Sequence, residues 1–268
     1  MVNQPIIMGV LNITPDSFSD GGLFLDTMSA VTQAQLMVTE GAGIIDIGGE
    51  SSRPGAPEVS SDDELRRVMP VIEALYGNID VPISIDTSKP IVMKEAFAAG
   101  ASIVNDVNAL RSEGALQMAA ELGADVCLMH MQGNPRTMQA NPTYDNVVQD
   151  VKEFFHERIA ACKSVGIQLS SITIDPGFGF GKNLGHNIAL LKNLSEFHDF
   201  GVSILAGLSR KSMIGVLLGD KDVDSRLIGS VTAALIAAEN GADIIRVHDV
   251  SETKDALRVW EQIQNFRE

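Results

Sequence analysis

The 268-residue sequence predicts an α/β fold in which eight short strands alternate with helices. The first reason is a recurring pattern: a helical stretch ends at Gly-Ala, and a short apolar run follows. Copies of this pattern begin at Gly41, Gly100, Gly123 and Gly241. Glycine suits the left-handed residue that ends a helix, and a buried parallel strand has a continuous apolar run. The second reason is that apolar residues between the runs recur at helical spacing.

The elements can be placed in order along the chain. Strands are expected at residues 6–11, 44–46, 81–85, 103–105, 125–127, 172–174, 202–206 and 244–246. Helical faces are formed by Val31, Ala34 and Val38, by Leu65, Val68 and Ile72, and by Leu227, Val231, Leu235 and Ala238. The last helix is expected from Ser251 to Phe266.

Strict alternation of strand and helix, without a Pro- or Ser-rich linker, predicts one closed domain over residues 1–268. The fold expected is a single eight-stranded parallel (β/α)8 TIM barrel. A doubly wound open sheet is the structural alternative, because strand order cannot be read from a sequence.

Composition excludes several classes of partner. The net charge of -15 and the pI of about 4.7 argue against nucleic acid and anionic membranes, which both favour basic surfaces. No run of about 18 apolar residues occurs, and the first residues lack signal-peptide features, so a cytoplasmic protein is expected. Cys127 and Cys162 have no metal-type spacing and are expected to be reduced thiols in the interior.

Polar residues follow all eight strands. They are, in chain order, Asn12, Gly48 with Glu50, Asp86, Asn105, His130, Asp175, Gly207 with Lys211, and Arg246 with His248. A single Asp after a strand is more often a helix cap than a ligand contact. Because the carboxyl ends of barrel strands converge on one mouth, the whole set predicts an active site there.

The charges at these positions sort into two kinds. Asp86, Asn105 and Asp175 offer acceptors that suit a flat heterocycle with several N–H donors. The cationic and donor groups suit a phosphate or carboxylate, and they are Arg53, Lys211, Arg246 and His248. The segment 209–212 opens a helix after the seventh strand, where backbone N–H groups can hold an anion.

Two long connections, residues 12–22 and 48–55, are rich in Gly, Pro, Ser and Asp. On the catalytic face of a barrel such loops are usually mobile segments that cover the substrate, and ordinary surface loops are the alternative. The glycine-rich segment 175–182 is not a Walker loop, because Asn183 stands where Ser or Thr would hold magnesium. Its glycines are expected to allow close backbone approach, with Phe180 as an apolar wall. The five His residues have no spacing typical of a zinc site.

Eight motifs together resemble the dihydropteroate synthase family over nearly the whole chain. They are residues 9–22, 48–55, 84–90, 105–107, 129–133, 175–182, 209–215 and 246–250. The resemblance implies a magnesium-dependent transferase of folate biosynthesis and a target of sulfonamides. Such an enzyme joins dihydropterin-methyl pyrophosphate to 4-aminobenzoate and releases pyrophosphate.

The resemblance also implies roles for individual residues. Pterin contacts are Asp86, Asn105, Met129, Asp175 and Lys211. Pyrophosphate contacts are Asn12, Arg246 and His248, with Asn12 on Mg2+, and Val247 is a further substrate contact. Aminobenzoate contacts are Phe18, Asp20, Ser52, Arg53, Pro54, Phe180, Ser209 and Ser212. The residues expected to act in catalysis are Asp20, Arg53, Lys211, Arg246 and His248.

The resemblance implies a homodimer, and small-molecule substrates as the other partners. Ser52 stands where many relatives have Thr, which predicts only a small change in packing. Two other functions are kept as alternatives. One is a methyltetrahydrofolate methyltransferase that works with a corrinoid protein, and the other is a non-catalytic pterin-binding protein. The methyltransferase would not need Arg53, residues 209–212 or the anion-binding residues 246–248, and the intact loop residues argue against the non-catalytic protein.

Overall fold

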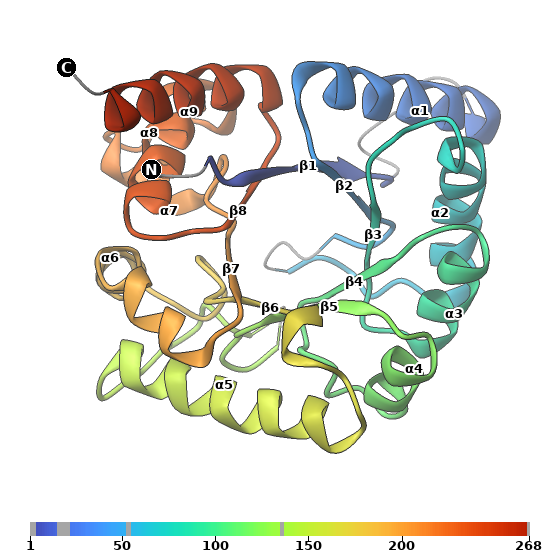
Figure 1. The fold of residues 1–268 in the computed structure, drawn as a ribbon, viewed down its shortest axis with the longest axis horizontal. Coiled ribbons are helices and arrows are strands. Elements are labelled where there is room, and N and C mark those ends of the chain that lie inside the picture. Colours follow the sequence, from blue (N-terminus) through green and yellow to red (C-terminus); the bar gives the residue numbers. More distant parts are fainter. Residues whose placement is uncertain (1–3, 15–21, 52–54, 135–136, 267–268) are drawn as a thin grey trace.

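The protein is described by a computed structural model that covers residues 4–14, 22–51, 55–134 and 137–266. Its eight strands pair in sequence order, each parallel to the next, and β8 closes on β1 (Figure 1). The strands are β1 Ile6–Asn12, β2 Ile44–Gly48, β3 Ile83–Asp86, β4 Ile103–Asp106, β5 Asp125–Met129, β6 Ile172–Asp175, β7 Ser203–Ala206 and β8 Ile244–Val247. The predicted (β/α)8 barrel is confirmed, and the open-sheet alternative is wrong.

The helices form a ring outside the barrel (Figure 1). They are α1 Gly22–Glu40, α2 Ser61–Leu75, α3 Pro90–Ala98, α4 Ala115–Glu121, α5 Val147–Ser164, α6 Leu184–Lys192, α7 Ser212–Leu217, α8 Leu227–Glu239 and α9 Val250–Asn265. Three 3-10 turns are η1 Leu169–Ser171, η2 Leu194–Phe200 and η3 Val223–Ser225. The alternation is not strict, because the short helix α7 precedes α8 between β7 and β8. Within the described ranges, no helix is both long enough and apolar enough to cross a membrane.

The recurring glycines end helices as predicted. Gly41, Gly100, Gly123 and Gly241 have φ angles of 107°, 119°, 61° and 94°, all in the left-handed region. A residue with a side chain rarely adopts these angles, so glycine lets each helix turn directly into the next strand.

The main core lies between the strands and the helices. Ile45 and Ile47 of β2 belong to it, together with Val68 and Val71 of α2. Because successive residues of a strand face opposite sides, the alternate residues of β2 face the inside of the barrel. The predicted burial of Cys127 and Cys162 is confirmed.

Candidate active site

The interior of the barrel changes from apolar to charged along its axis. Near the amino ends of the strands, one cluster contains Met8, Ile44, Cys127, Leu205 and Ile244. Two residues further along β2 and β8, the interior positions hold Asp46 and Arg246. We call the polar floor the set Asp46, Asp86, Asn105, Asp175, Lys211 and Arg246. Most of it lies at or just beyond the carboxyl ends of the strands, where the sequence predicts the active site, and Asp46 lies in the middle of β2.

Arg246 of β8 joins several members of the polar floor. Its Nε donates to Asp46 Oδ2 over 2.6 Å, and its Nη2 donates to Asp86 Oδ2 over 2.8 Å. The same Oδ2 of Asp46 accepts from Nδ2 of Asn105 over 3.0 Å. Arg246 is therefore held by two carboxylates, and a third polar side chain is tied to one of them.

Asp175 and Lys211 form the other half of the polar floor. Oδ1 of Asp175 accepts from the backbone N–H of Gly177 over 2.8 Å. Lys211 donates to the carbonyl of Phe178, and its Nζ lies 4.7 Å from the centre of the Phe180 ring. This is the geometry of a cation–π contact. The sequence prediction that strand ends converge is therefore confirmed for these groups.

Burial changes the protonation of the polar floor. Desolvation raises the pKa of Asp86 to about 8, although Arg246 opposes the shift. Desolvation also raises the pKa of Asp175, and it lowers the pKa of Lys211 to about 8. Arg246 has a raised pKa because Asp46 and Asp86 outweigh its desolvation. The polar floor holds three carboxyl groups and two cations, so acceptor oxygens are in excess and a ligand that brings N–H donors is favoured here.

The connection between β6 and α6, residues 176–183, is fixed by three side chains from other segments and by its own Lys182. Four consecutive carbonyl groups, those of residues 178–181, accept hydrogen bonds from Lys211, Gln139, Lys182 and Tyr144. For Tyr144 the distance from Oη to the carbonyl of residue 181 is 2.8 Å. This loop therefore has a defined shape without regular secondary structure.

The glycines of this loop allow the close approach that the sequence predicts. Gly177 and Gly181 have φ angles of 71° and 62°. A Cβ on Gly177 would lie 1.9 Å from the carbonyl oxygen of His130, and one on Gly181 would lie 2.6 Å from that of Gln132. Both contacts are too short for any side chain.

Lys182 and His130 form a buried pair that the sequence did not predict, although it placed His130 at a strand end. Nζ of Lys182 lies 2.8 Å from Nδ1 of His130 and donates to the carbonyls of His130 and Phe180 at 3.2 and 3.0 Å. Desolvation lowers the pKa of both side chains. The pair links the end of β5, which carries Met129, to the loop that carries Phe180.

The rim of the mouth holds further predicted residues. Half-buried Asn12 ends β1, and a Cβ on neighbouring Gly48 would lie 3.8 Å from both Asn12 Oδ1 and Asp86 Oδ2. Ser209 Oγ lies 3.0 Å from Nδ1 of His248 and accepts from the backbone N–H of His248 over 3.2 Å.

Three other predicted contacts are also placed. Met129 is buried at the end of β5, in a small cluster against which Phe180 packs. Ser212 is exposed and begins α7, as expected. Val247 has its side chain in the main core between the barrel and the helices. The predicted residues Phe18, Asp20, Ser52, Arg53 and Pro54 lie outside the described part of the chain.

An ion-pair cluster holds the flanks of the second long connection. Lys89 pairs with Glu50 and with the buried Glu64, at 2.5 Å for the latter. Oε1 of Glu50 also accepts from the backbone N–H of Val59 over 3.2 Å. The carboxylate of Glu50, predicted at the mouth, thus ties the two ends of this connection together.

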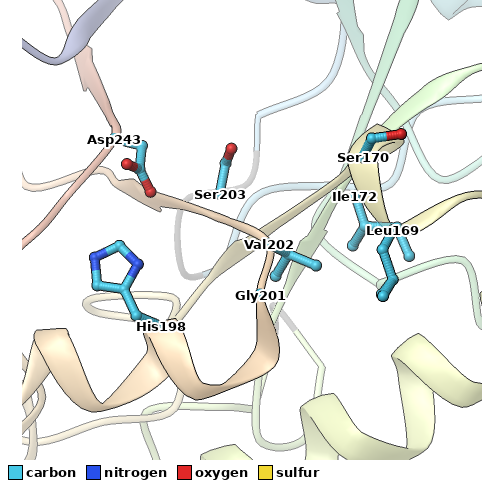
Figure 2. A pocket seen from close by; sticks show the side chains of 8 residues that line it. All are labelled: Leu169, Ser170, Ile172, His198, Gly201, Val202, Ser203 and Asp243. Carbon is cyan, nitrogen blue, oxygen red and sulfur yellow. The ribbon is translucent and has the colours of Figure 1, made fainter.

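A cavity of about 230 Å3 lies at the opposite end of the barrel (Figure 2). Figure 2 shows His198 and Asp243 on one side of it and Leu169, Ile172 and Val202 on the other. Oδ2 of Asp243 accepts from the backbone N–H of Ile204 over 2.8 Å, which is a structural role. The charged and amide side chains that the sequence predicts for the active site lie at the other end of the barrel, in the polar floor.

In the ranges that the structure describes, no three His, Cys, Asp or Glu side chains are placed to hold a metal ion.

Known proteins resemble this chain over nearly its full length. Residues 8–248 match the family model described as pterin binding enzyme. The dihydropteroate synthase of Escherichia coli K12 is 54% identical over 267 residues, which is 100% of this chain and 94% of that protein.

Two solved structures are also similar. The Yersinia pestis dihydropteroate synthase in a sulfonamide drug complex has a TM-score of 0.93 and 52% identity, covering 98% of this chain and 95% of that one. The Xanthomonas albilineans dihydropteroate synthase with 4-aminobenzoic acid has a TM-score of 0.93 and 49% identity, covering 99% and 95%.

Proposed function

This chain belongs to the pterin-binding enzymes and, among them, to the dihydropteroate synthases, and on that premise we propose which of its residues bind each substrate. The enzyme is a transferase of folate biosynthesis. It joins (7,8-dihydropterin-6-yl)methyl diphosphate to 4-aminobenzoate and releases pyrophosphate. The observation that carries the assignment of residues is the polar floor, where acceptors and cations from β2, β3, β4, β6, β8 and the segment after β7 meet.

The pterin ring binds the polar floor. Asp175 accepts from the 2-amino group and a ring N–H, because a carboxylate can accept two parallel hydrogen bonds. Asp86 and Asn105 add acceptors for the remaining N–H donors, and Lys211 donates to the ring carbonyl. Met129 packs on the face of the ring. The excess of carboxylates over cations in the polar floor supports a donor-rich ligand of this kind.

The diphosphate binds toward the rim, at Arg246, Val247 and His248, where Val247 contributes its backbone. Asn12 would hold Mg2+ through its side-chain oxygen. The donor set fits the metal, because magnesium prefers oxygen ligands and keeps several waters or phosphate oxygens. When bound, magnesium would neutralise charge on the diphosphate. Asn12 Oδ1 and Asp86 Oδ2 lie on the same side of Gly48, so two oxygen atoms are present at this part of the rim.

The aminobenzoate binds outside the pterin, against Phe180, Ser209 and Ser212. Its other contacts come from the two long connections, through Phe18, Asp20, Ser52, Arg53 and Pro54. A variant tests this part of the site. Arg53→Ala is expected to keep affinity for the pterin diphosphate and to lose turnover with aminobenzoate. Steady-state rates near those of the unmodified enzyme would contradict the assignment.

The protein supplies charge to the reaction and no nucleophile. The bond between the methylene carbon and the diphosphate oxygen breaks, and the electron pair leaves with the diphosphate. Arg246 and His248 meet the developing negative charge. The electron-rich pterin stabilises the methylene cation, with Asp20 adding negative charge nearby. The amine nitrogen of aminobenzoate then forms the new C–N bond and loses a proton to solvent.

A coupled assay tests the reaction directly. Purified protein is incubated with the pterin diphosphate, aminobenzoate and magnesium, and dihydropteroate and pyrophosphate are both measured. Equal amounts of the two products are expected, and chelation of magnesium should stop their formation. Methyltetrahydrofolate with a corrinoid acceptor serves as the contrasting substrate pair. Methyl transfer without dihydropteroate would overturn the assignment.

A homodimer is proposed through the helices that follow β7. Large apolar side chains are exposed on α7, α8 and α9, which lie together in Figure 1, and Ile228 and Ile263 are 76% and 69% exposed. An exposed apolar patch marks an interaction surface. Ile228→Glu is expected to produce monomers in sedimentation experiments, whereas Ile91→Glu on α3 should not. Sedimentation of the unmodified protein as a monomer would contradict the proposal.

Two further properties are proposed. A cytoplasmic location suits the free, buried thiols of Cys127 and Cys162. Inhibition by sulfonamides, in competition with aminobenzoate, is supported by the similarity to the Yersinia pestis enzyme.

A further inference from the structure

Asp46 belongs to the polar floor, yet it is fully buried beneath the groups assigned to the substrates. It lies in the middle of β2, in register with Ser84 of β3, and two residues before the end of the strand. Its Oδ2 accepts from both Arg246 and Asn105. Among the described residues, none donates to its Oδ1. A buried carboxylate is costly unless its partners compensate, so its contacts need an explanation.

The contact with Asn105 determines which end of the amide faces the mouth. A carboxylate can only accept a hydrogen bond, so the NH2 group of Asn105 must face Asp46. The amide oxygen of Asn105 is then the end left for a ligand. Together with Asp86 and Asp175, it completes a surface made of acceptors. A reversed amide would place N–H donors against the N–H donors of a pterin.

The contact with Arg246 has a second effect. The bond to Nε is made by Asp46, and the bond to Nη2 is made by Asp86. Two carboxylates on different strands fix the plane of the guanidinium, because each binds a different nitrogen. Asp46 therefore acts on both groups through a single oxygen atom.

We propose that Asp46 is a positioning residue, which holds Asn105 with its amide oxygen toward the pterin and holds Arg246 in the plane that meets the diphosphate. This inference rests on the proposed roles of Asn105 and Arg246. It assigns the specificity for N–H donors partly to a residue that does not contact the substrate.

Three variants test the inference. Asp46→Ala removes both hydrogen bonds and frees the amide of Asn105. Asp46→Asn keeps one oxygen that can accept from both partners, so it is the conservative variant. Ser84→Ala removes another buried side-chain oxygen at the same register of the next strand, and Ser84 Oγ has no partner among the described residues. Calorimetry gives the Kd for the pterin diphosphate, and steady-state kinetics give KM for each substrate.

We expect Asp46→Ala to bind the pterin diphosphate on the order of 10- to 100-fold more weakly. This fold-change corresponds to the loss of one or two hydrogen bonds to charged groups. KM for aminobenzoate should stay unchanged. Asp46→Asn should recover most of the affinity, and Ser84→Ala should bind like the unmodified enzyme. A purely structural role predicts instead that melting temperature and kcat fall while both KM values stay constant.

Two outcomes would overturn the inference. One is unchanged pterin affinity in Asp46→Ala, and the other is a well-folded Asp46→Asn that binds as weakly as an Asn105→Ala variant. The second outcome remains informative if Asp46→Ala does not fold. Failure of the proposed function is distinguishable, because the unmodified enzyme itself would then form no dihydropteroate.

Discussion

Replacing Asp175 by Asn removes one charge and turns one of its two acceptor atoms into a donor. Oδ1 accepts from the backbone N–H of Gly177, so the amide oxygen of Asn is expected to keep that place. The new NH2 group then points toward the ligand and Lys211. The ligand and Lys211 both present hydrogen-bond donors at this point. The NH2 group of Asn would therefore face other donors and find no acceptor.

The size of the effect follows from these contacts. A lost hydrogen bond to a charged group costs about 1.5–3 kcal/mol, and a buried donor left unpaired costs about 1–3 kcal/mol. The sum of about 2.5–6 kcal/mol corresponds to a Kd for the pterin diphosphate that is higher by roughly 70-fold or more. The fold should survive, because the bond to Gly177 is kept.

Calorimetry with the pterin diphosphate measures this Kd, and thermal melting checks the fold. The matched control is Asp243→Asn at the opposite end of the barrel, where Asp243 also accepts from a backbone N–H. It should leave the Kd unchanged. If Asp175→Asn binds with unchanged affinity, or if both variants lose affinity equally, the reasoning from the acceptor geometry is refuted.

Three other predictions concern the site. Because burial lowers the pKa of Lys211 to about 8, its proton is lost as the pH rises through 8, so kcat/KM for the pterin diphosphate should fall above that pH. Lys211→Arg should move this fall to higher pH, and an unchanged profile would contradict the assignment. Gly177→Ala should cost more than about 4 kcal/mol or prevent folding, whereas Gly166→Ala, with open space around it, should cost about 1 kcal/mol in denaturant unfolding. Tyr144→Phe should lower the free energy of unfolding by about 1 kcal/mol through the unpaired carbonyl of Gly181, with no loss if that bond is unimportant.

The barrel could be predicted from local patterns, because its strands and turns are encoded within short stretches. Gly41 and Gly241, for example, each end a helix and predict the strand that follows. The convergence of Asp86, Asn105 and Asp175 also follows, because the carboxyl ends of barrel strands meet by geometry. The sequence predicts that a helix opens at residues 209–212, but the six residues of α7 are too few for a periodic pattern to show that it ends before α8.

The residues of the site that the sequence did not predict are held by contacts between segments far apart in the chain. In the sequence, Asp46 is a polar residue at the end of the predicted strand 44–46. Only the register with β3 in the structure shows that it is an interior residue of the strand. Lys182 reads as part of a glycine-rich loop, and its partner His130 comes from another strand end. Tyr144 lies far along the chain from the carbonyl that it binds. Such pairings depend on side-chain reach in three dimensions, which spacing along the sequence does not encode.

The four carbonyl contacts of residues 178–181 have an entropic consequence. Fixing the backbone of a flexible loop costs about 1–2 kcal/mol for each residue. Here that entropy is lost once, when the chain folds and Gln139, Tyr144 and the two lysines bind the loop. Phe180 therefore meets its ligand already ordered, and little of the binding free energy is consumed in arranging this wall. Part of the affinity at this site therefore depends on Gln139 and Tyr144, which have no proposed contact with the substrate.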